Sequence, residues 1–382
     1  MAVVIQKKDL LEAVQKAFPV VPSKSSLLIL SNFKLSYANS ILEVAATDAD
    51  HSLKVTAGAS GEGPLDITVN AKKVFEIVRE LPEGEVTLSL AGDDGTVLII
   101  ESEKGFNCKI AGADSSDFPG IPQITGGTEF NINGSALRDM ILKTSFAASK
   151  DESRASLCGV LWELSSDKAG MVATDGHRLG YSFTEMNLGI SKDISKIISQ
   201  KSVTMLVRIT DPKNQDEFIN VVIGDKYVSF STPAFTMVSK IIEGQYPDYG
   251  KVIPKNNPKI VTADRAALSE AIRRVSVLSS QKNHLIKLIF KENTVEAVVM
   301  NREIGGEARE IVEIEYDGEE HVVGFNGQYF TEILDIMKTQ KVRLEMNTQI
   351  SACLIFSVYE DDEEKIGDDL FLLMPLRIMD EF

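Results

Sequence analysis

The 382-residue sequence lacks the features of membrane and secreted proteins. Its longest apolar runs, such as LFLLMPL at 370–376, stop after about seven residues, whereas a membrane-spanning helix needs about 18. The N-terminal MAVVIQKK has too short an apolar stretch, with its lysines on the wrong side, for a secretory signal. Only three cysteines occur, Cys108, Cys158 and Cys353, with no C-x-x-C pair, which argues against a disulfide framework and a zinc site. We expect a cytoplasmic protein without metal or cofactor.

A surplus of positive charge is also missing. The chain has 40 Lys and Arg against 56 Asp and Glu, a formal net charge of −16. Proteins that neutralise phosphates usually carry a basic surplus. Composition alone therefore argues against a nucleic-acid partner, and only the placement of the charges along the chain reopens that possibility.

Two series of repeated motifs run through the chain. ATDADHSL at 46–53 and ATDGHRLG at 173–180 place Thr47 and Thr174 127 positions apart, and a further 127 leads to Asn301 in VVMNREIGG. A proline recurs at intervals of 128, at Pro119, Pro247 and Pro375. Because a third of the chain is about 127 residues, the sequence predicts three copies of one domain, at 1–124, 125–254 and 255–382.

Each third shows two amphipathic helical patterns, with apolar residues three and four apart. The first helices are expected over 6–17, 135–150 and 265–282, and the second helices over 71–81, 191–201 and 327–341. Asn70, Ser191 and Asn326 precede the second helices as N-caps. Alternation of period two predicts hairpins over 33–46 and 286–299. The expected fold is α+β, with six similar helix-plus-sheet half-units.

Positive charge is concentrated in the expected helices. The six segments hold 18 Lys and Arg against 9 Asp and Glu, a surplus of +9, which leaves −25 for the rest of the chain. One interpretation is that these are solvated helix faces, since helices favour lysine and loops favour aspartate. The other is that the helices line one basic surface while the remaining surface repels polyanions.

Three motifs resemble the bacterial DNA polymerase III beta subunit family, the sliding clamps: VATDGHRL at 172–179, YPDYGKVIP at 246–254 and LMPLRI at 373–378. The resemblance covers essentially the full length. It implies a head-to-tail homodimeric ring of three-domain chains, with helices facing a central hole around duplex DNA and sheets outside. It also implies a non-catalytic processivity factor in DNA replication, whose partners are the polymerase catalytic subunit, the clamp loader and repair polymerases, with no membrane.

The resemblance assigns roles to three groups of residues. The partner-peptide pocket would comprise Leu157, Thr174, Gly176, His177, Arg178, Leu179, Pro247, Val252, Met374, Pro375, Leu376 and Arg377. The DNA-facing residues would be Lys8, Lys16, Lys24, Lys72, Arg79, Arg138, Lys143, Lys196, Arg273, Arg274 and Lys338. The dimer interface would place Phe106 and Cys108 against Val277 and Leu278, with Lys73 available for an ion pair at the rim.

Two other interpretations stay open. Asp175 and His177 could belong to a hydrolase, although no Ser-His-Asp signal, H-E-x-x-H motif or Gly-rich phosphate loop accompanies them. The repeats could also form a scaffold that does not bind DNA. Three departures from the family are Lys251 in place of a frequent arginine, the tail 379–382, and the acidic segment 359–369.

Overall fold

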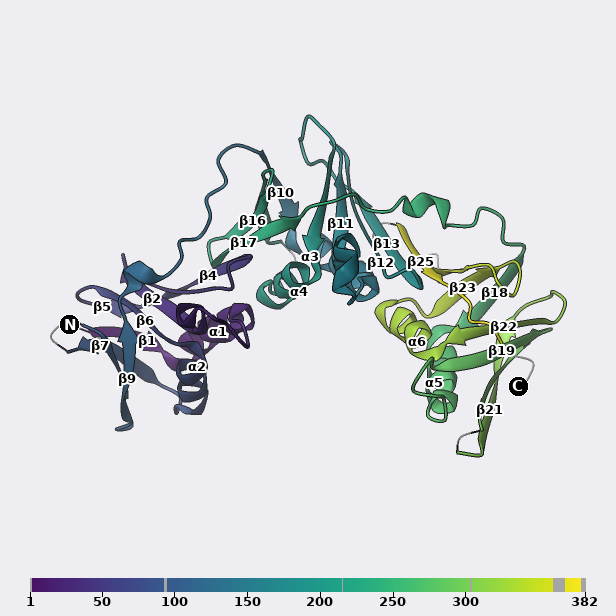
Figure 1. Cartoon of the computed structure of the whole chain (residues 1–382), viewed down its shortest axis with the longest axis horizontal. Coiled ribbons are helices and arrows are strands. Elements are labelled where there is room, and N and C mark those ends of the chain that lie inside the picture. The colour runs from purple at the N-terminus through teal and green to yellow at the C-terminus, as the bar shows by residue number, and fades with distance from the viewer. Residues whose placement is uncertain (1, 93–94, 215, 303, 360–367, 379–382) are drawn as a thin grey trace. The chain divides into compact units, whose positions relative to one another are not determined.

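The computed structural model describes residues 2–92, 95–214, 216–302, 304–359 and 368–378. The chain folds into two compact units. Unit 1 contains residues 1–138 and 201–241, and unit 2 contains residues 139–200 and 242–382. Figure 1 follows the chain through them by colour, and each unit is described by itself. No helix in the described ranges is long and apolar enough to cross a membrane.

The same order of elements occurs three times, as two helices set among strands. The first series is β1 (Ala2–Gln6), α1 (Lys7–Ala17), β2 (Asn32–Ala38), β3 (Ile41–Thr47), β4 (His51–Gly58), β5 (Ser60–Gly61), β6 (Leu65–Asn70), α2 (Ala71–Glu80), β7 (Glu85–Ala91), β8 (Val97–Ser102) and β9 (Asn107–Ala113).

The second series is β10 (Thr128–Asn133), α3 (Gly134–Thr144), β11 (Gly159–Leu164), β12 (Lys168–Thr174), β13 (Arg178–Glu185), β14 (Ile194–Ser199), α4 (Gln200–Ile209), β15 (Phe218–Ile223), β16 (Tyr227–Thr232) and β17 (Phe235–Ile242). The third is β18 (Lys259–Asp264), α5 (Arg265–Ser276), β19 (Leu285–Lys291), β20 (Thr294–Asn301), β21 (Gly306–Glu315), β22 (His321–Asn326), α6 (Gly327–Ile336), β23 (Lys341–Met346), β24 (Cys353–Val358) and β25 (Asp368–Leu373).

In unit 1 the antiparallel strands follow the order β6-β2-β3-β4-β17-β16-β15-β10. The central pair, β4 with β17, joins a strand of the first series to the last strand of the second, with Leu53 opposite Met237. A second ladder, β1-β7-β8-β9, meets β6 through Gly112 and Ala113. Helices α1 and α2 pack against each other, and α1 also packs on β4.

Unit 2 repeats this plan. Its strands follow the order β14-β11-β12-β13-β25-β24-β23-β18. The central pair is now β13 with β25, where Gly180 lies opposite Phe371. A further ladder, β21-β20-β19-β22, meets β18 at the end of β21. Helices α5 and α6 pack on these strands over a core that includes the fully buried Phe325 and Phe330.

Most of the predicted elements are confirmed. Both hairpins form, and the side chains of Asn70 and Asn326 accept hydrogen bonds from the third backbone N–H of their helices. The helices over 135–150, 265–282 and 327–341 end earlier than predicted, at Thr144, Ser276 and Ile336.

The helix predicted over 191–201 is wrong. Residues Ile194–Ser199 form strand β14, which pairs along its whole length with β11, so Ser191 caps no helix. The second helix of this repeat is α4, at Gln200–Ile209. Isoleucines at 194, 197 and 198 satisfy a helical spacing, but β-branched side chains favour a strand when a pairing partner is present.

Candidate functional site

The ATDGHRL motif forms a tight turn between β12 and β13. The Asp175 carboxylate accepts hydrogen bonds from the backbone N–H groups of His177, at 2.8 Å, and Arg178, at 3.1 Å. The Thr174 hydroxyl donates to the carbonyl of Arg178 at 2.7 Å. Gly176 has φ of +92°, a conformation that suits glycine. These side chains therefore fix the turn from within.

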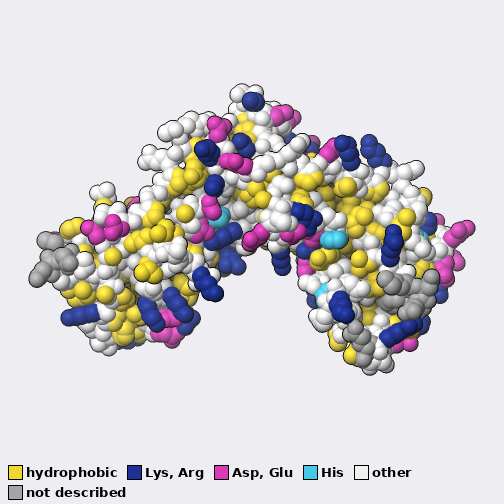
Figure 2. All heavy atoms as spheres, viewed as in Figure 1, with side chains coloured by type: hydrophobic (Ala, Val, Ile, Leu, Met, Phe, Trp, Pro, Cys, Tyr) yellow, Lys and Arg dark blue, Asp and Glu magenta, His cyan; other side chains and the backbone are white. Residues whose placement is uncertain are grey.

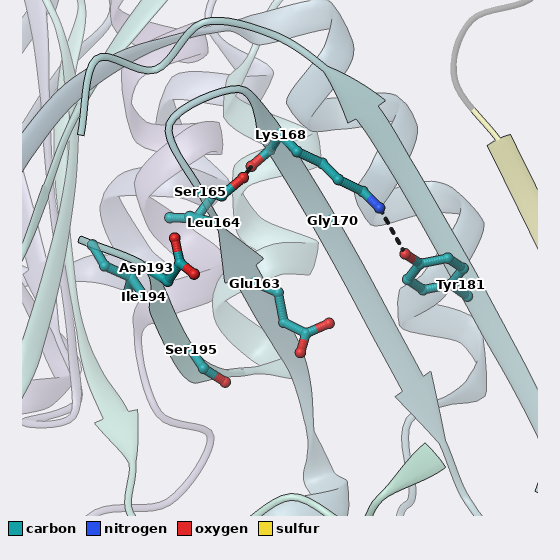
Figure 3. A pocket seen from close by; sticks show the side chains of 9 residues that line it. All are labelled: Glu163, Leu164, Ser165, Lys168, Gly170, Tyr181, Asp193, Ile194 and Ser195. Carbon is teal, nitrogen blue, oxygen red and sulfur yellow. Dashed lines mark hydrogen bonds between the residues drawn. The ribbon is translucent and has the colours of Figure 1, made fainter. Parts of the chain in front are cut away.

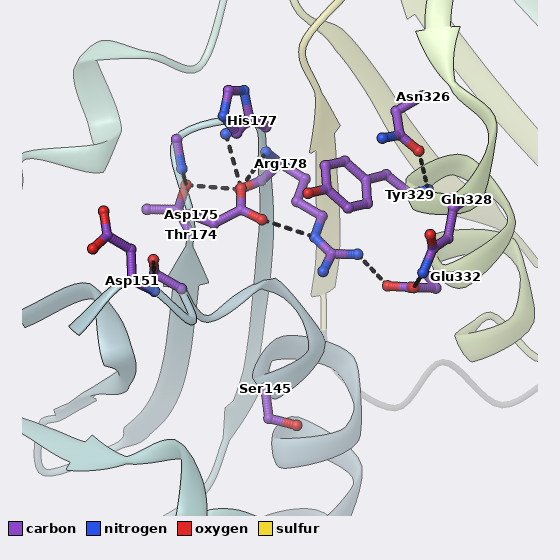
Figure 4. A network of polar contacts seen from close by, with 12 residues as sticks. Ser145, Asp151, Thr174, Asp175, His177, Arg178, Asn326, Gln328, Tyr329 and Glu332 are labelled. Atoms are coloured by element: carbon purple, nitrogen blue, oxygen red, sulfur yellow. Dashed lines mark hydrogen bonds and ion pairs between the residues drawn. The ribbon is translucent and has the colours of Figure 1, made fainter. Parts of the chain in front are cut away.

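His177 and Asp175 do not form a catalytic pair. The His177 imidazole is exposed and points away from the Asp175 carboxylate (Figure 4), and within the described ranges it makes no hydrogen bond or ion pair. A general base needs a nucleophile within reach and a group that orients its ring. Because the carboxylate instead holds the turn, the geometry gives no support to the hydrolase hypothesis.

Arg178 ties this turn to helix α6. Its guanidinium is buried, with Nε 3.2 Å from Oδ2 of Asp175, and Nη1 donates to the carboxylate of Glu332 (Figure 4). The guanidinium carbon lies 4.1 Å from the centroid of the Tyr329 ring and 5.2 Å from that of Phe146. A planar cation held between two carboxylates and two rings has little freedom. Arg178 therefore fixes the position of the turn.

An apolar cluster lies beside the turn, where β13 meets the C-terminal strand. Leu179 and Leu372 are buried opposite each other, and Met374, Ile253 and Tyr249 pack on them while staying partly exposed. The backbone N–H of Met374 donates to the carbonyl of His177 at 2.8 Å. The structure thus brings three sequence motifs, ATDGHRL, YPDYGKVIP and LMPLRI, to one place in unit 2, which we call the groove.

The other predicted pocket residues lie around this cluster with different exposure. Val252 is 54% exposed, and Gly176, Pro247 and Arg377 are also exposed. Thr174, Pro375 and Leu376 are half-buried, and Leu157 is nearly covered. The backbone N–H of Leu376 donates to the carbonyl of Gly324 at 2.8 Å, which anchors the C-terminal segment on β22.

Sequence reasoning missed several neighbours of the groove. Tyr329 and Glu332 hold Arg178 from α6, and Tyr249 and Ile253 belong to the apolar cluster. Tyr249 and Ile253 lie within YPDYGKVIP, so this motif could have predicted them as neighbours of the groove. Lys251 is exposed and pairs with Asp248 at 3.1 Å. The tail 379–382 and residues 360–367 of the acidic segment lie outside the described residues.

The basic residues predicted to face DNA differ in their surroundings. Lys8 and Lys24 are exposed, whereas most of the others pair with carboxylates: Lys16 with Glu12, Lys72 with Glu76, Arg79 with Glu80, Arg273 with Asp335, Arg274 with Glu270 and Glu310, and Lys338 with Asp139. Arg138 donates to the carbonyl of Val207. Figure 2 shows dark blue side chains gathered over the helices of unit 1.

Two of the lysines predicted to face DNA, Lys143 and Lys196, do not lie on an exposed helix face. Lys143 is buried, with its ammonium 2.5 Å from Asp139 and 2.6 Å from Asp369, so it is not available to a phosphate. Lys196 lies on strand β14 and not on a helix. The six observed helices carry 13 Lys and Arg against 8 Asp and Glu, a surplus of +5 where the sequence predicted +9. Helix α6 carries two acidic residues and no basic one.

Among the described residues, β9 and β21 each have an open edge. β9 pairs with β8 over Asn107–Ala111, and β21 pairs with β20 over Gly306–Glu313. Within the described ranges no strand pairs with the second edge of either stretch. Exposed apolar side chains lie close by in sequence, Phe106 at 40% and Val277 at 80% exposure, while Cys108 is half-buried and Leu278 packs against the core. Open edges of this kind invite pairing with another chain.

Comparisons with known proteins place this geometry in a family. Models of the N-terminal, central and C-terminal domains of the DNA polymerase III beta subunit match residues 1–122, 131–248 and 250–367. The beta sliding clamp of Pseudomonas putida is 30% identical over 377 residues, covering 98% of this chain and 99% of that protein. The beta sliding clamp of Caulobacter vibrioides is 30% identical over 383 residues, covering 99% of this chain and all of that protein.

Solved structures agree. The sliding clamp of Pseudomonas aeruginosa, in a crystal structure bound to griselimycin, superimposes with a TM-score of 0.90 at 29% identity, covering 99% of this chain and 100% of that chain. The DNA polymerase III beta subunit of Thermotoga maritima gives a TM-score of 0.88 at 27% identity, with the same coverage. The chain therefore belongs to the DNA polymerase III beta subunit family, the beta sliding clamps.

Proposed function

We propose that two copies of this sliding clamp close head to tail into a ring around duplex DNA, and that the groove in unit 2 holds peptides of replication and repair proteins. The repeated strand junction carries the first part of this proposal. In each unit, a strand that ends a three-stranded run of one repeat pairs with the last strand of another repeat.

The two junctions inside the chain have the same register. Met237 of β17 lies opposite Leu53 of β4, and Phe371 of β25 lies opposite Gly180 of β13. Gly180 is 127 positions after Leu53, the period of the repeat. By the repeat, β4, β13 and β21 are equivalent strands, and so are β9, β17 and β25. Each junction pairs one strand of the first set with one strand of the second. The chain uses β4 with β17 and β13 with β25, which leaves β21 and β9.

Register across the third junction follows from the repeat. Glu307 is 127 positions after Gly180, at the same place in β21. Cys108 is the equivalent of Met237 and Phe371, because each lies opposite a buried residue of the preceding strand. These buried residues are Ile100, Phe230 and Ile355. We therefore expect Cys108 of one copy to lie opposite Glu307 of a second copy. A head-to-tail contact that closes after two subunits forms a ring and leaves no open edge.

A ring holds DNA by threading, so its contacts with DNA need not be tight. Phosphate contacts carry no sequence information, and each neutralised phosphate contributes about −0.9 to the salt slope of log K. Exposed cations such as Lys8 and Lys24 are the candidates for such contacts. Pairing of most other basic residues with carboxylates weakens their attraction to phosphate, which suits a protein that moves along its polymer.

The groove suits peptides that place one or two large apolar side chains on the exposed Val252 and the half-buried Met374. Each buried anchor contributes about 1.5–3 kcal/mol before ordering costs, so affinity stays modest and partners can exchange. By the family resemblance these partners are the polymerase catalytic subunit, the clamp loader and repair polymerases. The chain would act in the cytoplasm as a non-catalytic accessory subunit.

Disulfide trapping tests the ring and its register. With Glu307→Cys in place, oxidation should link Cys108 to the new cysteine of a second copy, because directly opposite residues have Cβ atoms about 4.5–5.5 Å apart. A non-reducing gel should show a covalent dimer in high yield.

Two matched controls define the result. Adding Cys108→Ser to Glu307→Cys should abolish the dimer, which excludes a role for Cys158 and Cys353. Arg309→Cys, two positions along β21, should link poorly, since cysteines with Cα atoms more than about 7 Å apart are not bridged. Equal yields from Glu307→Cys and Arg309→Cys would contradict the proposed register, and no dimer from either would contradict the ring.

A further inference from the structure

A second cavity lies on the same sheet face as the groove in unit 2. It measures about 560 Å³ and is lined by aromatic, apolar and charged residues of four strands and of the segment that follows β24. Those that define it are Tyr181, Phe183, Phe356, Tyr359 and Leu370, with Arg343 at its wall. Pockets of about this size bury apolar groups and use a few polar ones for orientation.

A row of apolar residues runs from the groove to this cavity, with Leu372 and Leu179 buried in its middle. Met374, Leu372 and Leu370 alternate along the C-terminal strand and therefore share one face. On β13, Leu179 lies opposite Leu372 and Tyr181 lies opposite Leu370. At about 3.3 Å per residue, Leu370 lies about 13 Å from Met374 along the strand. An extended peptide anchored in the groove needs only a few more residues to reach the cavity.

Two cations lie at the aromatic residues of the cavity, Lys168 beside Phe183 and Tyr181 and Arg343 over Phe356. The Lys168 ammonium lies 3.6 Å from the centroid of the Phe183 ring and 3.4 Å from the Tyr181 hydroxyl. Figure 3 shows the contact with Tyr181 from the neighbouring pocket, which Lys168 and Tyr181 line together with Glu163 and Asp193. Among the described residues Lys168 forms no ion pair. Arg343 lies over Phe356 at 5.0 Å and pairs with Glu345 at 3.0 Å. Lys168 is thus a half-buried cation held only by a ring and a hydroxyl.

We infer that this cavity receives a further apolar or aromatic side chain, next to a carboxylate, from the same partner peptide that occupies the groove. The inference rests on the proposed function of the groove. The lining provides apolar contact for the side chain, and Lys168 provides the partner for the carboxylate. Asp368 and Asp369 also line the cavity, so we expect the carboxylate on the side of Lys168, and a polyanion such as DNA is disfavoured.

Fluorescence anisotropy with synthetic peptides tests this inference. The short peptide carries two large apolar anchors for the groove. Two longer peptides extend the short one with a flexible spacer and Phe-Asp, the first at its N-terminus and the second at its C-terminus. Two matched controls carry Ser-Asn in place of Phe-Asp. We expect one Phe-Asp peptide to bind the wild-type ring about tenfold more tightly than the short peptide, and the Ser-Asn peptides to match the short one.

Variants then assign the gain to the cavity. Lys168→Glu and Phe356→Ala should each remove most of the tenfold gain, while the control Lys213→Glu, an exposed charge of unit 1, should keep it. An unchanged Kd for the short peptide shows that each variant ring is folded. Equal binding of all peptides by the wild type, or a gain that survives both variants, would overturn the inference. Failure of the short peptide itself would instead overturn the proposed groove.

Discussion

The two strand junctions within the chain have the same backbone register but differ in the side chains packed against the paired strands. In unit 1, Phe235 of β17 is buried beside β4, and Lys16 of α1 pairs with Glu12 of its own helix. At the equivalent places in unit 2 stand Asp369 and Lys143, both buried and paired with each other at 2.6 Å. One junction is therefore apolar, and the other contains an ion pair taken out of water.

The turns beside the two junctions differ in the same way. In ATDADHSL, the Asp48 carboxylate accepts from the His51 ring nitrogen at 3.0 Å and from the ammonium of Lys201 at 2.5 Å, with Lys201 partly exposed. In ATDGHRLG, the residue equivalent to His51 is Arg178, buried between two carboxylates and two rings. Only the second junction carries the groove, so its buried charges coincide with the place where partner peptides are proposed to bind.

Buried ion pairs specify geometry at a cost in stability, since both ions lose their water. Strands held by apolar contacts alone tolerate small shifts, whereas charges buried at fixed positions do not. We therefore expect the polar network behind β13 and β25 to hold the groove in one shape, whereas the junction of unit 1 needs only to stay closed.

The largest effect is expected at Lys143. Lys143→Ala leaves Asp369 buried without its cation, and loss of one partner of a buried pair costs about 3–5 kcal/mol. The equivalent change in unit 1, Lys16→Ala, should cost under about 1 kcal/mol, because its pair with Glu12 is partly exposed. Hydrogen exchange followed by mass spectrometry should show lost protection in β13 and β25 for the first variant only.

A double variant sharpens this comparison. Lys143→Leu with Asp369→Phe gives unit 2 the apolar chemistry of unit 1, and it should recover most of the protection that Lys143→Ala loses. Protection as low as in the single variant would show that shape, and not charge, distinguishes the junctions.

A medium effect is expected at Arg178. Arg178→Lys keeps the charge but loses the planar fork and its packing against Tyr329 and Phe146. The groove should then bind the short apolar peptide about tenfold more weakly by anisotropy, a loss of about 1.4 kcal/mol. His51→Lys, at the equivalent place in unit 1, should leave peptide affinity unchanged. Equal losses in both variants would contradict a special role for the second junction.

The smallest effect concerns pH and Asp48. Burial alone would raise the pKa of Asp48, but hydrogen bonds from His51 and Lys201 outweigh it and hold the pKa well below its usual range. A lowered pKa means that the ionised form contributes stability above the unfolded pKa of about 3.9, and this contribution is lost as pH falls through the folded pKa.

Urea unfolding of the wild type and of Asp48→Asn measures this contribution. The wild type should be more stable by about 1 kcal/mol above about pH 5, and the difference should shrink below about pH 3.9. A difference that grows on acidification would contradict the assignment.

The sequence alone predicts the parts of this architecture that depend on local patterns. Three repeats, the two hairpins and the caps at Asn70 and Asn326 follow from spacing and turn chemistry. Strand β14 is not predicted, because isoleucines three and four apart fit a helix as well as a strand, and only pairing with β11 decides between them. Three helices end earlier than their apolar patterns predict.

Contacts between residues far apart in the sequence could not be predicted from local patterns. Lys143 reads as one more basic residue of a helix, and nothing near it in the sequence reveals that Asp369 will cover it. Arg178 likewise reads as part of a pocket wall, although Glu332 of α6 turns it inward. The groove was assigned through the family resemblance of three motifs, and their proximity became visible only in the fold.

Threading on DNA is the central claim, and a covalently closed ring tests it most directly. The Glu307→Cys protein is mixed with nicked circular DNA under reducing conditions, oxidised to close both interfaces, and washed at about 1 M salt, where phosphate contacts are screened. We predict that the closed ring stays on the circle and is released when a restriction enzyme linearises it. Equal retention on circular and linear DNA, or loss from both, would contradict encirclement.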